Sequence, residues 1–356
     1  MSRHELAMQT LRLGTVIPAT PLALDSGRKF DKRRQRLLMR YYLAAGAGGI
    51  ATAVHTTQFE IRRPEYNLFE PVLETVAEEI ERHERDTGKS VVRIAGVCGP
   101  AGQAAREAAT ARALGYDAVL LSPGGLGGMT EAELIDRTKA VASVMPVIAF
   151  YLQPAAGGRL FTYPYWERIF EIENVVAVKA ASFNRYQTSE LVRAAALSPK
   201  AEQITLYTGN DDNIVVDLLT KYRFAKNGKI VEKRFSGGLL GHWSVWTHQV
   251  VRMFEQIKRA VAEDIIPAEL LTLAAEVTDA NSAVFDTAHG FAGCIPGVHE
   301  VLRRQGLLEG AWCLNPEEVL SPGQAEEIER VCRMYPHLND DDFVAQRLQE
   351  WMVGIS

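Results

Sequence analysis

The chain has 356 residues, a length that allows one large α/β domain with additions. Of these residues 47% are hydrophobic and 23% charged, which is ordinary for a globular protein. The formal net charge of −5 gives no reason to expect a nucleic-acid partner, and no apolar run is long enough to cross a bilayer. The first 14 residues contain no apolar segment typical of a signal peptide, and the 4 cysteines are scattered without a C-x-x-C pair. We therefore expect a cytoplasmic protein with no disulfide framework, zinc finger or membrane association.

Short apolar segments alternate with amphipathic segments through most of the chain. The expected strands cover residues 15–19, 49–54, 91–97, 118–121, 147–152, 175–179, 204–208 and 235–240. The expected helices cover residues 31–45, 69–84, 101–114, 131–144, 165–170, 188–196, 213–222 and 245–262. Such alternation indicates βαβ units and a parallel sheet, and eight strand–helix pairs in roughly 250 residues favour a (β/α)₈ TIM barrel. A glycine-rich segment follows only the fourth strand and lacks the G-x-G-x-x-G spacing, which disfavours a dinucleotide-binding sheet.

The C-terminal part of the chain has a helical pattern. Helices are expected at residues 268–283, 298–305 and 323–335. We therefore expect a barrel over residues 1–264 and a C-terminal helical appendage over residues 265–356. A hairpin insertion is also predicted near residues 223–234, because Asn227 and Gly228 both adopt positive φ readily and lie between two short runs. This insertion is expected to serve packing or assembly.

Lys179 is a single cation within an apolar strand segment. Burial penalises the charged form of an amine, so a lysine in this position loses its proton more easily and becomes a nucleophile. The alternative is a lysine at a strand end, whose stem packs while its head reaches water.

The other candidate residues follow neighbouring strands, at the end of a barrel where active sites form. Tyr151 ends the fifth strand, and a phenol facing the amine of Lys179 would shuttle protons. Thr56 and Thr57 offer hydroxyl and backbone N–H groups for a small carboxylate, and His55 beside them is an acid–base candidate. Alternatively, Tyr151 is a core aromatic residue, Thr56 and Thr57 form a local side-chain turn, and His55 is packed at the mouth of the barrel.

Together these motifs resemble the dihydrodipicolinate synthase/N-acetylneuraminate lyase superfamily of Schiff-base-forming (β/α)₈ enzymes. The resemblance runs from residues 14–22 through the barrel and weakly into the helical tail. It implies that Lys179 is the Schiff-base lysine, Tyr151 the strand-five tyrosine and Thr56-Thr57 the carboxylate site. The resemblance implies that Gly209, Asn210 and Gly238 bind the substrate, whereas His55 is a candidate for substrate binding from its position alone. The resemblance also implies a tetramer built from dimers.

The chain departs from the superfamily pattern where the second substrate is bound. The usual Gly-Thr-Thr-Gly-Glu is replaced by a segment that begins at His55, and glycines stand where the synthase has a relay tyrosine donated by a neighbouring subunit. Ala156 replaces the arginine that holds the aldehyde substrate, and Ala180 replaces an acidic residue. These departures argue against a true dihydrodipicolinate synthase and indicate that only the pyruvoyl-binding half of the site is retained.

The leading functional hypothesis is a lyase that acts on a 2-oxo acid through a Lys179 Schiff base, without a cofactor. It would carry out reversible aldol cleavage, with pyruvate as one partner. The same imine also supports a dehydratase of a 2-oxo deoxy sugar acid, and the sequence leaves both reactions open. A metal-dependent aldolase or hydrolase and a non-catalytic keto-acid-binding protein are further alternatives. Ligands for the metal would come from His55, His242, His289, Asp211 and Asp212, which lack the close spacing of a zinc site.

Overall fold

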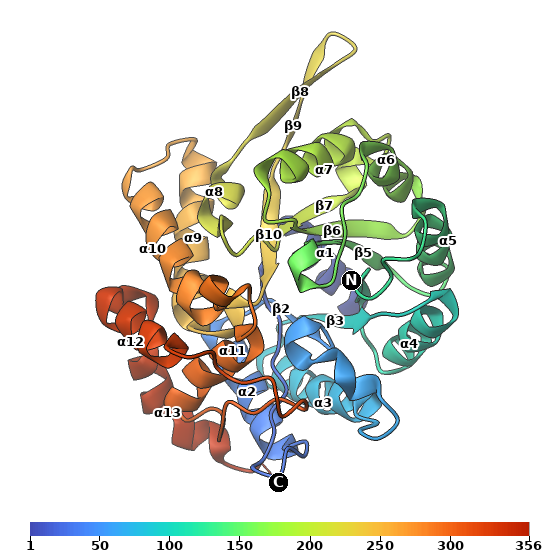
Figure 1. Ribbon diagram of the computed structural model, residues 1–356. Helices are drawn as coiled ribbons and strands as arrows, with labels where there is room; N and C mark the ends of the chain where they lie inside the picture. The colour runs from blue at the N-terminus through green and yellow to red at the C-terminus, as the bar shows by residue number, and fades with distance from the viewer. Residues whose placement is uncertain (356) are drawn as a thin grey trace. The chain divides into compact units, whose positions relative to one another are not determined.

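The computed structural model of the protein describes residues 1–355. Eight strands form a sheet in the order β1-β10-β7-β6-β5-β4-β3-β2, and helices alternate with the strands along the chain (Figure 1). This is the (β/α)₈ barrel fold with additional C-terminal helices, so the predicted fold class is confirmed. The chain divides into two compact units, residues 1–15 with 92–239 (unit 1) and residues 16–91 with 240 onward (unit 2), which are described separately.

Unit 1 contains the consecutive parallel strands on which the candidate lysine lies. Its strands are β3 (Val92–Val97), β4 (Ala118–Leu121), β5 (Val147–Leu152), β6 (Val175–Ala181), β7 (Thr205–Thr208) and most of β10 (Phe235–Leu240). Its helices are α1 (Arg3–Leu13), α4 (Ala101–Ala113), α5 (Glu131–Ala142), α6 (Tyr163–Glu171), α7 (Arg185–Leu197) and α8 (Ile214–Leu219), with short 3₁₀ turns η3 (Pro154–Ala156) and η4 (Ala201–Gln203). These strands are buried almost throughout, as expected for a parallel sheet with apolar runs.

Helix α1 is an element that the sequence pattern did not predict. A capping box starts the helix, because the Ser2 side chain accepts from the backbone N–H of Glu5 while the Glu5 side chain accepts from that of Ser2. The carbonyl of Leu11 accepts a 2.8 Å hydrogen bond from the hydroxyl of Tyr207 on β7. The Ser-x-x-Glu spacing was therefore the overlooked signal, and α1 covers the sheet at Tyr207.

The predicted insertion is a two-stranded antiparallel hairpin, β8 (Tyr222–Lys226) and β9 (Lys229–Lys233), which extends beyond α7 in Figure 1. Asn227 and Gly228 form its turn with φ of 50° and 75°. The ammonium group of Lys226 donates to the carbonyl of Leu197 at the end of α7, so the base of the hairpin is tied to that helix.

Unit 2 contains the first two strands and all the C-terminal helices. It comprises β1 (Val16–Pro18), β2 (Gly49–Thr52), α2 (Lys32–Ala45), α3 (Phe69–Thr87), α9 (Thr247–Glu263), α10 (Glu269–Val284), α11 (Cys294–Arg304), α12 (Gln324–Met334) and α13 (Asp341–Met352). Short 3₁₀ turns are η1 (His55–Thr57), η2 (Phe59–Arg62), η5 (His242–Ser244), η6 (Thr287–His289) and η7 (Pro336–Leu338). The C-terminal helices group with α2, α3 and α9 in this unit.

A buried carboxylate ties the C-terminal region to the rest of unit 2. Asp340 precedes α13 and accepts hydrogen bonds from the hydroxyl of Tyr41 at 2.8 Å and from the backbone N–H of His248 at 3.0 Å. Helix α13 packs on α2, where Trp351 lies close to the ring of Tyr41. Among residues 1–355, no helix is both long enough and apolar enough to span a bilayer.

Candidate active site

Lys179 lies in the middle of the unit 1 sheet, on β6. Its Cα pairs with those of Phe150 on β5 and Tyr207 on β7, and its side chain is only 9% exposed. Burial lowers the pKa of the amine from its ordinary 10.5 to about 8, and the negative charge of Asp211 opposes part of this shift. A substantial fraction of the amine is therefore neutral, and hence nucleophilic, in mildly alkaline solution.

The side chain of Lys179 is held between an aromatic ring and a glycine. Its Nζ lies 4.6 Å from the ring centroid of Phe150. A Cβ atom at Gly209 would lie 2.5 Å from the Cε and 3.0 Å from the Cγ of Lys179. Gly209 is therefore placed where only a residue without a side chain leaves room for the lysine stem.

Tyr151 does not face the amine as predicted. Its Cα pairs with that of Ala180, one position beyond Lys179, and register partners in a parallel pair share a face. The phenol instead donates a 2.7 Å hydrogen bond to the Oε1 atom of Gln187 on α7. Its ring packs against Trp166 on α6, with centroids 5.4 Å apart. Tyr151 thus points into the helix layer, and the residue before it, Phe150, lies beside the amine.

Thr56 and Thr57 lie in η1, directly after β2 in unit 2. The Thr56 hydroxyl donates to the carbonyl of Ala19 at 2.7 Å, and the Thr57 hydroxyl donates to that of Thr20 at 2.7 Å. The Thr57 oxygen also accepts from the backbone N–H of Val54. Both hydroxyl hydrogens are therefore engaged by backbone carbonyls, so these hydroxyls shape the turn.

His55 begins η1 and is half-buried. Its ring centroid lies 6.0 Å from that of Phe59. Gln58, which directly follows η1, adopts a φ of 68°, and Val54, which directly precedes η1, is extended. The segment therefore turns sharply at the carboxyl end of β2.

Asn210 acts as a structural tie in the loop after β7. Its Nδ2 donates to Asp217 on α8 at 2.8 Å and to the Thr188 hydroxyl on α7 at 3.3 Å, while its Oδ1 accepts from the backbone N–H of Phe183. The side chain is fully buried and its donors and acceptor are used within unit 1. Gly238 lies on β10, where its Cα pairs with that of Thr208.

Among residues 1–355, no group of three or more His, Cys, Asp or Glu side chains is arranged to hold a metal ion. His242 is buried in unit 2, and burial lowers the pKa of its imidazole to about 4. His289, also in unit 2, lies 2.6 Å from a carboxylate oxygen of Asp286.

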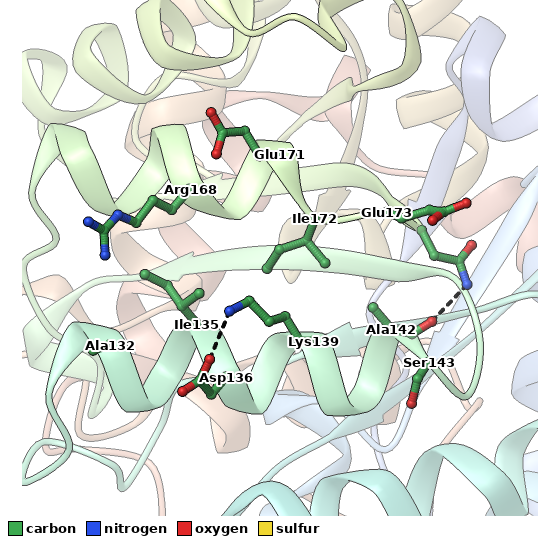
Figure 2. Close-up of a pocket in the computed structure, with 11 residues that line it drawn as sticks. Ala132, Ile135, Asp136, Lys139, Ala142, Ser143, Arg168, Glu171, Ile172 and Glu173 are labelled. Atoms are coloured by element: carbon green, nitrogen blue, oxygen red, sulfur yellow. Dashed lines mark hydrogen bonds and ion pairs between the residues drawn. The ribbon is translucent and has the colours of Figure 1, made fainter.

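A groove of about 1060 Å³ lies between α5 and α6 in unit 1 (Figure 2). Lys139 in this groove pairs with Asp136 at 2.9 Å, and Asn174 donates to the carbonyl of Ala142 at 2.9 Å. Asn174 immediately precedes β6, so the groove reaches the amino end of that strand. Barrel enzymes carry their active sites at the carboxyl ends, which makes the strand ends near Lys179 the better candidate site.

Comparison with known proteins identifies the family of this chain. The sequence profile of the dihydrodipicolinate synthetase family matches residues 12–221. The chain belongs to this family. A 4-hydroxy-tetrahydrodipicolinate synthase from Nostoc sp. is 33% identical over 205 residues, which are 56% of this chain and 60% of the Nostoc protein. The match therefore spans less than two thirds of that relative's length.

Solved structures of family relatives share the fold over nearly the whole chain. A dihydrodipicolinate synthase from Oceanobacillus iheyensis has a TM-score of 0.73 at 14% identity, covering 94% of this chain and 99% of its own. An N-acetylneuraminate lyase from Fusobacterium nucleatum has a TM-score of 0.69 at 16% identity, covering 91% and 99%. At such identities the likeness establishes the (β/α)₈ fold, and the named relatives are a synthase and a lyase.

Proposed function

We propose that this member of the family is a lyase that acts on a 2-oxo acid through a Schiff base on Lys179. The observation that carries the proposal is a buried strand amine with a pKa of about 8, held between Phe150 and Gly209. The neutral amine attacks the keto carbon, and loss of water from the carbinolamine leaves an iminium. This cation withdraws electrons from the neighbouring carbon, which supports making or breaking a carbon–carbon bond there.

Pyruvate is the proposed 2-oxo acid, because the retained motifs are those of the pyruvoyl-binding half of the family site. A solved relative from E. coli K12, 15% identical with a TM-score of 0.71, is described in complex with pyruvate. Aldol cleavage or condensation is the leading reaction, and dehydration of a 2-oxo deoxy sugar acid uses the same iminium. We also propose that the protein is a cytoplasmic homo-oligomer.

The remaining motif residues have more limited proposed roles. Thr56 and Thr57 are proposed to hold the substrate carboxylate at the η1 turn. Their hydroxyl hydrogens bond backbone carbonyls and the backbone N–H of Thr57 donates to the carbonyl of Val54 at 3.0 Å, so the backbone N–H of Thr56 is the proposed donor. His55 is proposed to move a proton near that carboxylate. Gly209 is proposed to make room for the lysine, and Asn210 is proposed to hold the loop after β7 in place through its side-chain hydrogen bonds.

Reductive trapping tests the proposal. Borohydride added with pyruvate converts an iminium into a stable secondary amine, which intact-mass spectrometry and peptide mapping locate. We expect one adduct at Lys179, and none in Lys179→Ala. Lys139→Ala removes an exposed, ion-paired lysine and is the matched control that keeps the adduct. An adduct that persists in Lys179→Ala, or none with any of a panel of 2-oxo acids, would overturn the proposal.

A further inference from the structure

We propose that Phe150 is a catalytic residue whose ring face stabilises the positive charge of the iminium formed at the Nζ of Lys179. This inference rests on the proposed Schiff-base function and adds a residue that the sequence motifs do not indicate. The ring of Phe150 lies beside the amine, in the place that was predicted for the phenol of Tyr151.

The geometry around the Nζ atom is set by three neighbouring strands. Phe150 and Lys179 are register partners on β5 and β6, so their side chains leave the same face of the sheet. The Nζ lies 4.6 Å from the ring centroid, within the range of cation–π attraction, and Phe150 is itself only 7% exposed. Gly209, which directly follows β7, leaves the space that the lysine stem fills.

The electron-rich face of the ring attracts a cation at Nζ and does not attract the neutral amine in the same way. In the proposed step, the neutral amine, the keto group and one proton become an iminium and one water molecule. The new N–C bond forms at the keto carbon, and the keto oxygen leaves as that water. Because the nitrogen remains on the lysine and again carries positive charge, the ring favours the iminium over the uncharged carbinolamine.

Phenylalanine has no ionisable group and cannot transfer a proton. Its contribution is therefore confined to the electrostatic attraction between its ring face and the cation, and to the position of the lysine side chain. The hydroxyl of Tyr151 donates its hydrogen to Gln187, and the Cα of Tyr151 pairs with that of Ala180, not with that of Lys179. The ring therefore offsets part of the penalty that burial imposes on a cation at this place in the sheet.

Two substitutions at residue 150 separate the ring face from apolar volume. Phe150→Leu keeps an apolar side chain without a π face, whereas Phe150→Tyr keeps the face. Each variant and the wild type is incubated with a series of pyruvate concentrations and cyanoborohydride at one pH above 8, where the Lys179 amine of the free protein is mostly neutral and only the iminium carries charge. The adduct is followed by intact mass. Thermal melting of each variant shows that the fold is retained.

We expect the half-saturating pyruvate concentration for trapping to rise roughly five- to thirtyfold in Phe150→Leu, the range that buried cation–π energies correspond to. The half-saturating pyruvate concentration of Phe150→Tyr is expected to stay within about twofold of the wild-type value, because tyrosine keeps the ring face. A purely steric role for Phe150 would not require this result. If the wild type is trapped and Phe150→Leu is trapped equally well, the role of Phe150 is overturned while the Schiff-base function stands. If the wild type is not trapped, both proposals fail.

Discussion

The reactivity of Lys179 follows from a charge held in a buried strand. Its lowered pKa means that the neutral, attacking form is half populated near pH 8 and levels off roughly two pH units higher. We predict that the initial rate of adduct formation with pyruvate, measured from pH 6 to 10 with a fixed reductant, has its midpoint near 8. A rate that is still rising steeply at pH 10, with no midpoint in this range, would show that burial does not lower the pKa of the amine.

The same buried charge destabilises the folded protein. The folded pKa of Lys179 is lowered, so between pH 8 and 10.5 the unfolded state binds more protons. The penalty is fully present below pH 8 and disappears as the pH rises through this window. We therefore predict that Lys179→Met raises the unfolding free energy at pH 7, by up to roughly 3 kcal/mol.

Urea unfolding at pH 7 measures this effect, and Lys139→Met serves as the control. Lys139 is 59% exposed and paired with Asp136, so its replacement is expected to change the unfolding free energy by less than about 0.5 kcal/mol. A Lys179→Met protein less stable than the wild type would contradict the prediction.

The side chain of Lys179 occupies space that is open only because Gly209 has no side chain. We predict that Gly209→Ala lowers trapping by pyruvate at least about tenfold, because the new methyl group would displace the lysine stem, and costs about 1–3 kcal/mol of stability. Gly127→Ala is the control, since no heavy atom lies within 4 Å of its added methyl group. Equal trapping by the two variants would show that the lysine does not depend on this space.

At the scale of elements, the hairpin depends on a turn that few residue types adopt. Asn227 and Gly228 both have positive φ, and Gly228→Ala would add a side chain in that conformation at a cost of about 1 kcal/mol or more. We predict faster hydrogen exchange at the amides of β8 and β9 in this variant, measured by mass spectrometry. Asn227→Gly, which suits the same turn, is expected to keep wild-type protection.

The register of β5 against β6 decides which aromatic residue meets the amine. Tyr151 and Phe150 are neighbours in an apolar strand, and each is a plausible inward residue from the sequence pattern alone. Successive side chains point to opposite faces, so a shift of one residue exchanges the two. The register is a property of two paired strands, and a buried strand that is apolar on both faces has no alternation to reveal it.

At the scale of the whole molecule, the order of strands and helices could be read from the chain. Each predicted barrel strand overlaps a strand of the structure. A short apolar run between two amphipathic segments indicates a buried strand from neighbouring residues alone. Helices α1 and α13 were not predicted. The grouping of the C-terminal helices with β1 and β2 was also not expected, because it depends on packing between distant parts of the chain.

The sequence by itself determined the (β/α)₈ fold and singled out Lys179, because hydrophobic periodicity and a cation in an apolar strand are local features. Tertiary structure alone decided that Phe150 lies beside the amine, that Tyr151 bonds Gln187, and that Gly209 makes room for the lysine. These outcomes depend on strand register and on contacts between separate elements. Local sequence carries little information about either, since the same residues would support a register one position away.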